Sequence, residues 1–284
     1  MSKIKLFTDS TCDLPQQLLE KNDVSVLPLY VNFEDQIYRD GVDITGNQLI
    51  EKVKKSEHFP STSAVSPADY YQTFKDYIEE GQEIIYIGLS SKISSSLQNA
   101  ILTAARFPEG KVNVIDSLNL STGVGLLVLK AVDYIKSGLK TAEIVAKIEK
   151  IIPKVKTEFV VEDLEFIHRG GRCSGLQKFL SSMLRIRPIL EVKTGEVVPA
   201  EKVRGKKKRV LKRMLQRVLT NKEIIDPGQI FIPQAAAEKE AQFLKEGIKE
   251  AGFNKVTITE AGSVISTHCG PGTVGIVYNE KVSD

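Results

Sequence analysis

A short apolar strand, a serine-rich turn and a helix follow one another in residues 84–105, and this order constrains the fold more than any other feature. The apolar run ends at Gly88, and apolar residues with helical spacing begin at Leu97. Between them, five of the seven residues in 90–96 are serines. A helix start presents unpaired N–H groups and a positive dipole end, so this turn can bind an anion. A serine N-cap without any ligand is the alternative interpretation.

Strands and helices alternate over the first half of the chain, which predicts an α/β fold with a parallel sheet. Apolar strands are expected at 4–8, 24–31, 84–88 and 112–115, and helices at 68–80, 120–136 and 141–152. The polar segments 32–45 and 59–67 have the composition of loops, with a helix expected to begin at Thr45 or Asn47.

Polar residues follow three of the expected strands. They are Asp9-Ser10-Thr11, Ser90–Ser96 and Asp116-Ser117. Ligands of parallel sheets bind beyond the carboxyl ends of the strands. We therefore expect these turns to converge on one cleft.

The pattern changes near residue 154 and predicts a second unit. Strands are expected at 158–161, 229–232 and 255–260, and helices at 176–184, 206–220 and 235–251. The segment Lys193-Thr194-Gly195-Glu196 has the composition of a hairpin turn. The interpretation is two α/β domains with parallel-rich sheets, the first comprising residues 1–155 and the second residues 156–284.

Composition favours a cytoplasmic protein. No apolar run approaches the roughly 18 residues that a membrane-spanning helix needs. The first residues lead into an expected strand without a signal-peptide core. The three cysteines are far apart and odd in number, which favours a reducing compartment over a disulfide framework or a zinc site.

The net charge of +3 is unevenly distributed. Residues 201–217, the basic segment, contain nine Lys and Arg against one Glu, a local charge of +8, so the other residues sum to −5. Nucleic-acid binding is disfavoured because no aromatic residues are interleaved for base stacking. A solvated face, an acidic protein partner and an anionic membrane surface remain open. The candidate contact residues are Lys202, Arg204, Lys206, Lys207, Lys208 and Arg209.

Two glycine motifs resemble functional signatures but stand in the wrong context. Residues 270–275 match GxGxxG, yet only nine residues follow, and they have a strand pattern instead of a helix. Residues 171–175 have the form of a cysteine nucleophile elbow, but no apolar strand precedes them. We interpret the first motif as a turn and the second as a loop that brings Arg172 close to an anion. With three scattered histidines, no metal site is expected.

His268 lies among hydroxyl and thiol side chains immediately before the first of these turns. One interpretation is a loop histidine whose hydrogen bonds are satisfied within the protein. The other is a partner for a bound anion, with the imidazolium form favoured by a nearby carboxylate.

In their order along the chain, these segments resemble the DegV family, the lipid-binding subunits of bacterial fatty acid kinase, over essentially the whole sequence. The resemblance rests on Asp9-Ser10-Thr11-Cys12-Asp13-Leu14-Pro15, Thr62-Ser63, Leu89-Ser90-Ser91 to Ser94, Gly170-Gly171-Arg172, Arg187-Pro188-Ile189-Leu190 with Lys202-Val203-Arg204, and the turn His268–Gly275. Two positions depart from the family pattern. Ser95-Ser96-Leu97 stands where members often have Gly-Thr-Tyr, and Cys173 replaces an aliphatic residue.

The resemblance implies two α/β domains with a buried fatty acid between them, its acyl chain in an apolar tunnel mostly within the C-terminal domain. It implies that Thr62 and Ser94 hydrogen-bond the carboxylate, with His268 and Arg172 in the surrounding polar network. It also implies that a separate ATP-binding kinase subunit converts the carboxylate to an acyl phosphate for phospholipid synthesis, so the chain needs no cofactor of its own. Elementary energetics agree, since a buried carboxylate needs donors and each buried CH₂ contributes roughly 0.8 kcal/mol.

Two classes of function follow from the sequence. The first is a non-catalytic subunit that binds a fatty acid and presents it to the kinase. The alternative is a stand-alone esterase or acyltransferase that uses Ser94 or Cys173 as its nucleophile.

Overall fold

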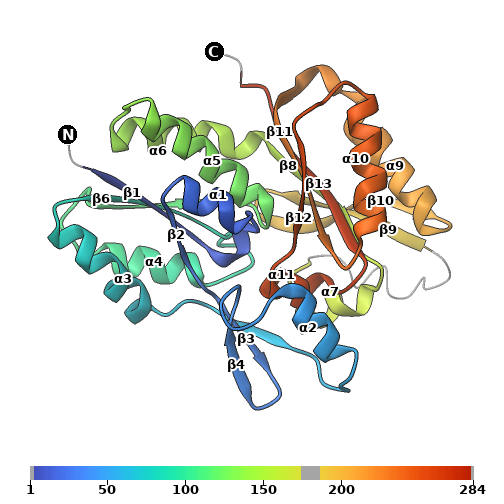
Figure 1. Ribbon diagram of the computed structural model, residues 1–284, viewed down its shortest axis with the longest axis horizontal. Helices are drawn as coiled ribbons and strands as arrows, with labels where there is room; N and C mark the ends of the chain where they lie inside the picture. Colours follow the sequence, from blue (N-terminus) through green and yellow to red (C-terminus); the bar gives the residue numbers. More distant parts are fainter. Residues whose placement is uncertain (1–2, 174–185, 283–284) are drawn as a thin grey trace.

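A four-stranded parallel sheet with helices on both faces forms the left part of the computed structural model, which describes residues 3–173 and 186–282 (Figure 1). The strand order is β2-β1-β6-β7. The strands are β1 (Ile4–Asp9), β2 (Val24–Leu27), β6 (Glu83–Gly88) and β7 (Val112–Asp116). The predicted parallel sheet is confirmed here, since all three strand pairs are parallel.

Side chains alternate along these strands and give the sheet two buried faces. Leu6 belongs to the core under α5 (Thr122–Lys136) and α6 (Thr141–Ile151). Its neighbour Phe7 belongs to the core under α3 (Pro67–Glu79) and α4 (Ser96–Ala104). The shorter elements of this half are η1 (Ser10–Cys12), α1 (Gln16–Lys21) and η2 (Ile152–Lys154).

A six-stranded sheet lies at the right of Figure 1, in the order β10-β9-β8-β13-β11-β12. Its strands are β8 (Val155–Val160), β9 (Ile186–Lys193), β10 (Glu196–Arg204), β11 (Ile225–Ala235), β12 (Val256–Glu260) and β13 (Thr273–Glu280). The helices α9 (Lys207–Thr220) and α10 (Glu238–Glu250) cover its outer face, with η3 (Lys222–Ile224) between α9 and β11. The inner face contributes Phe231 and Val277 to the core under α5, so α5 packs against both sheets.

The second sheet is mixed, which corrects the expectation that both sheets would be parallel-rich. Only β11 and β12, which the crossover helix α10 connects, form a parallel pair. The β9–β10 pair is antiparallel because Thr194 and Gly195, at φ 48° and 87°, make the tight turn expected from their composition. The last strand, β13, runs opposite to both of its neighbours. The division into domains at residues 155 and 156 stays a prediction.

A third, small sheet corrects two further expectations. The strand expected at 24–31 is split into β2 and β3 (Tyr30–Phe33), because Pro28 cannot donate to a ladder. The segments 32–45 and 59–67, expected to be loops, contain β4 (Gln36–Arg39) and β5 (Ser61–Ser63), which both pair with β3. Both strands are short and mostly exposed, so neither has an apolar pattern. The predicted helix start is confirmed, because Thr45 caps α2 (Gly46–Val53).

Two short helices complete the junction between the sheets. These are α7 (Leu164–Gly170) and α11 (Ser263–Cys269), and α11 packs against both α2 and α7 (Figure 1). Helix α11 was not predicted, because its serines and threonine resemble loop composition. The helix predicted at 176–184 lies outside the described residues. Within the described part of the chain, no helix combines the length and the apolar character that crossing a membrane requires.

Candidate functional site

An apolar pocket of about 160 Å³ lies between the turns of the parallel sheet and the inner face of the six-stranded sheet. Its apolar lining comes from both halves of the chain and includes Leu29, Leu89, Ile93, Leu120, Phe159, Ile167, Val197, Ala261, Val264 and Ile265. Thr62, Ser94, Arg172 and His268 line the same pocket. The structure therefore brings all four predicted site residues to one place.

Thr62 and His268 make direct contact. Thr62 is the middle residue of β5, and His268 is the penultimate residue of α11. Thr62 Oγ1 lies 2.9 Å from His268 Nε2. Arg172 is placed by the end of α7, where Gly171 takes a left-handed conformation at φ 65° and turns the chain toward the pocket.

The serine-rich turn separates into structural serines and two serines, Ser94 and Ser95, that line the pocket. Ser90 is fully buried and donates to the carbonyl of Gly195, at 2.8 Å. Ser91 donates to Asp116 Oδ2, and Ser96 Oγ accepts the N–H of Val65. Ser94 lines the pocket, and its Oγ accepts the backbone N–H of Ser96 at 3.2 Å. Its hydroxyl proton therefore remains available for a ligand.

The protein environment of His268 favours the neutral ring over the imidazolium form that a nearby carboxylate would favour. Burial and, to a lesser extent, the nearby Arg172 guanidinium lower the pKa of His268 to about 4. Its Nδ1 is buried without a hydrogen-bond partner among the described residues. Gly170 packs against that atom so closely that a Cβ there would lie 2.6 Å from Nδ1. A ligand carboxylate beside the ring would favour the protonated form.

Two buried carboxylates close to the pocket were not predicted as site residues. Asp13 and Asp40, at 7% and 2% exposure, accept hydrogen bonds from the backbone of Gly262 and Ser263, at the start of α11. Burial raises the pKa of both carboxyl groups. Asp13 belongs to the N-terminal motif, but nothing in the sequence around Asp40 beyond a turn signal indicates a long-range contact.

Comparison with known proteins identifies the family. A family model described as uncharacterised proteins of the DegV family matches residues 3–281. The chain belongs to the DegV family. A DegV domain-containing protein of Clostridium acetobutylicum is 38% identical over 283 residues, which is 99% of this chain and 100% of the relative.

Solved DegV structures confirm the α/β fold. One from Thermus thermophilus, described as a fatty-acid-binding DegV family protein, has a TM-score of 0.92 at 34% identity and covers 98% of this chain and 100% of its own. A stearic-acid-binding protein from Eubacterium ventriosum has a TM-score of 0.88 at 25% identity, with 99% of each chain covered.

Neither proposed nucleophile of this DegV protein has the setting of a hydrolase. His268 pairs with Thr62, and within the described part of the chain its Nδ1 lacks the orienting acceptor that a catalytic triad supplies. Burial raises the pKa of the Cys173 thiol to about 11, so the thiolate is scarce at neutral pH. Among the described residues, no group of three or more His, Cys, Asp and Glu is arranged to hold a metal ion.

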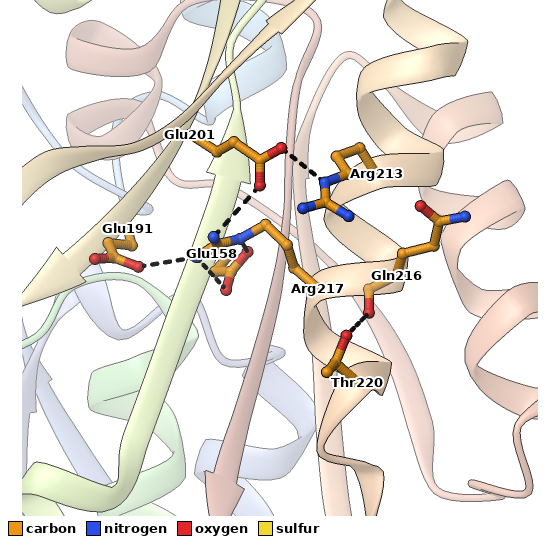
Figure 2. A network of polar contacts seen from close by, with 7 residues as sticks. All are labelled: Glu158, Glu191, Glu201, Arg213, Gln216, Arg217 and Thr220. Atoms are coloured by element: carbon orange, nitrogen blue, oxygen red, sulfur yellow. Dashed lines mark hydrogen bonds and ion pairs between the residues drawn. The ribbon is translucent and has the colours of Figure 1, made fainter.

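The basic segment of this DegV protein divides into inward and outward cations. Figure 2 shows Arg217 of α9 between three carboxylates that point toward it from adjacent strands. The distances are 3.1 Å to Glu158, 3.3 Å to Glu191 and 3.5 Å to Glu201. Lys207 is also internal, with ion pairs to Glu162 and Glu240, whereas the other five predicted contact residues are exposed: Lys202, Arg204, Lys206, Lys208 and Arg209.

Proposed function

We propose that this DegV protein binds a long-chain fatty acid and presents its carboxylate to a separate ATP-dependent kinase subunit, which converts it to an acyl phosphate for phospholipid synthesis. The observation that carries the proposal is one pocket whose mostly apolar lining also includes Thr62, Ser94, Arg172 and His268. The description of similar solved proteins as fatty-acid-binding supports it.

The polar residues suit a carboxylate. The hydroxyls of Thr62 and Ser94 can donate to its oxygens, and the neutral ring of His268 can orient Thr62. Arg172 donates to the carbonyl of Gly170 at 2.7 Å and forms no ion pair among the described residues, so its positive charge is not already neutralised. Burying a carboxylate without such partners costs several kcal/mol.

The apolar lining supplies most of the affinity in this proposal. Each buried methylene contributes roughly 0.8 kcal/mol, so an acyl chain binds tightly without a covalent bond. The polar residues of the pocket thus determine where the carboxylate binds, and the apolar lining determines the affinity for the acyl chain.

The exposed cations of the basic segment form the partner surface in this proposal. Lys202, Arg204, Lys206, Lys208 and Arg209 would contact an acidic surface of the kinase subunit or, transiently, an anionic membrane. We place the protein in the cytoplasm, where its three free cysteines stay reduced.

Mass spectrometry of freshly purified, denatured protein tests ligand binding. We expect a co-purified long-chain fatty acid, and delipidated protein that regains it from solution. Incubation with a DegV-dependent kinase subunit, ATP and hydroxylamine tests the second step, because hydroxylamine traps acyl phosphate as a hydroxamate. Protein that neither carries nor binds any fatty acid would refute the proposal, and bound fatty acid without hydroxamate would restrict it to lipid binding.

A further inference from the structure

The helix α11 begins without a cap of its own, because the residue that precedes it is Gly262. Its first N–H groups are nevertheless paired. Asp13 Oδ1 accepts the N–H of Gly262 at 2.8 Å, and Asp40 Oδ1 accepts the N–H of Ser263 at 2.7 Å and its hydroxyl at 2.6 Å. The two carboxylates precede their partners by 249 and 223 positions. Two residues from the N-terminal part of the chain, Asp13 and Asp40, therefore cap the start of α11.

The two carboxylates converge on one backbone position. A Cβ built on Gly262 would lie 3.0 Å from Asp40 Oδ1 and 3.1 Å from Asp13 Oδ1. Buried acids so close to each other oppose ionisation, and Asp9 adds a third negative group near Asp13. A local serine would cap the helix at lower cost. What these carboxylates add is a connection from α11 to the ends of η1 and β4.

His268 stands near the other end of the same seven-residue helix. There it contacts Thr62 of β5, so α11 is fixed to the N-terminal half at both of its ends. A shift at the capped end would move His268 relative to Thr62, because so short a helix moves as one body. We propose that Asp13 and Asp40 are positioning residues that fix α11 and thereby hold His268 against Thr62 in the pocket.

NMR titration of the imidazole Cε1–H signals tests this proposal in the full chain. The chain has three histidines, and the His268 signal is the one that His268→Gln removes. In the unsubstituted protein, it should titrate with a pKa of about 4. In Asp40→Ala and Asp13→Ala, we expect that pKa to rise toward the ordinary 6.5, because a displaced ring becomes hydrated.

Two variants separate positioning from a general loss of stability. Asp40→Asn keeps the Oδ1 acceptor and should preserve the His268 titration. Asp226→Ala removes a carboxylate that pairs with Lys130 and accepts the N–H of Gly228 outside the pocket lining, and should leave the titration unchanged even where it lowers the unfolding temperature. If Asp40→Ala does not fold, Ser263→Ala removes one of the two hydrogen bonds to Asp40 and should produce a smaller shift in the same direction.

Fatty-acid affinity provides a second readout, which rests on the proposed function. We expect stearate to bind Asp40→Ala about tenfold more weakly and Asp40→Asn about as tightly as the unsubstituted protein. An unchanged His268 titration in the folded alanine variants would overturn the positioning role. A complete absence of stearate binding to the unsubstituted protein would instead refute the proposed function, and the NMR result would still decide the role of Asp13 and Asp40.

Discussion

Thr62 and His268 are 206 positions apart in the sequence, and their side chains meet with Thr62 Oγ1 2.9 Å from His268 Nε2. The contact joins a three-residue strand near the start of the chain to the last helix. It lies beside Ser94 and Arg172 in the lining of one pocket. The neutral ring of His268 needs no counter-ion, so Thr62 can direct its hydroxyl group toward a ligand or toward the ring.

Removing the pocket hydroxyls should weaken fatty-acid binding. We expect Thr62→Val and Ser94→Ala each to reduce the affinity for stearate by about 10- to 100-fold, since a hydrogen bond to a charged group contributes about 1.5–3 kcal/mol. Calorimetric titration of delipidated protein measures the change. Ser91→Ala is the matched control, because Ser91 belongs to the same turn but bonds Asp116. Unchanged affinity in both pocket variants would refute this carboxylate site.

The stability of the protein should depend on pH through His268. Its pKa is about 4 in the folded protein, below the ordinary 6.5, so between these values the unfolded chain binds the additional proton. The contribution of His268 to the free energy of unfolding is therefore complete above pH 6.5 and is lost as the pH falls toward 4. The loss amounts to about 2–3 kcal/mol.

Urea unfolding of ligand-free protein between pH 4 and 7 measures this dependence. His268→Gln should give a shallower pH profile across that interval, because the group that titrates is gone. An identical slope in the variant and the unsubstituted protein would show that His268 is not the group responsible.

The strands and helices of the parallel half were predictable because local patterns determine them. Buried strands of four to six residues alternate with amphipathic helices, and Thr45 caps its helix with side chains three positions apart. The antiparallel pairing of β13 was not predictable, because one of its two neighbours, β8, is more than a hundred positions away. The small strands β4 and β5 were missed since they bury few side chains.

The polar side of the pocket was predictable only in part. Thr62, Ser94, Arg172 and His268 were named through the family resemblance, whereas composition alone left the serine turn between a ligand site and a plain cap. The role of Asp40 at the start of α11 has no local signal, because its partner Ser263 is 223 positions away. Contacts of this kind arise from the tertiary fold alone.

A side chain at position 170 should destabilise the protein, because it would clash with the ring of His268. A methyl group there would lie 2.6 Å from Nδ1, although alanine is otherwise about 1 kcal/mol more favourable than glycine within a helix. We expect Gly170→Ala to lower both the stability and the stearate affinity. In a His268→Ala background, the same substitution should become neutral or stabilising. A double-mutant cycle measured by urea unfolding checks this, and purely additive effects would contradict a direct clash.

The inward and outward cations of the basic segment should respond differently to substitution. Arg217→Met leaves Glu158, Glu191 and Glu201 together without their shared cation, so we expect the free energy of unfolding to fall by about 3–5 kcal/mol. The exposed pair Lys208 and Arg209 lies outside this network. The double substitution Lys208→Glu and Arg209→Glu should leave stability within about 0.5 kcal/mol of the unsubstituted protein.

The same double variant tests the partner surface. We expect it to bind the kinase subunit, or vesicles that contain an anionic phospholipid, at least tenfold more weakly at low salt, with a smaller difference as salt screens the charges. Lys222→Glu in η3 provides a matched control, because it changes the charge of an exposed lysine that lies outside the basic segment. Unchanged affinity for both partners would remove this surface from the proposal and leave the exposed cations as solvated surface residues.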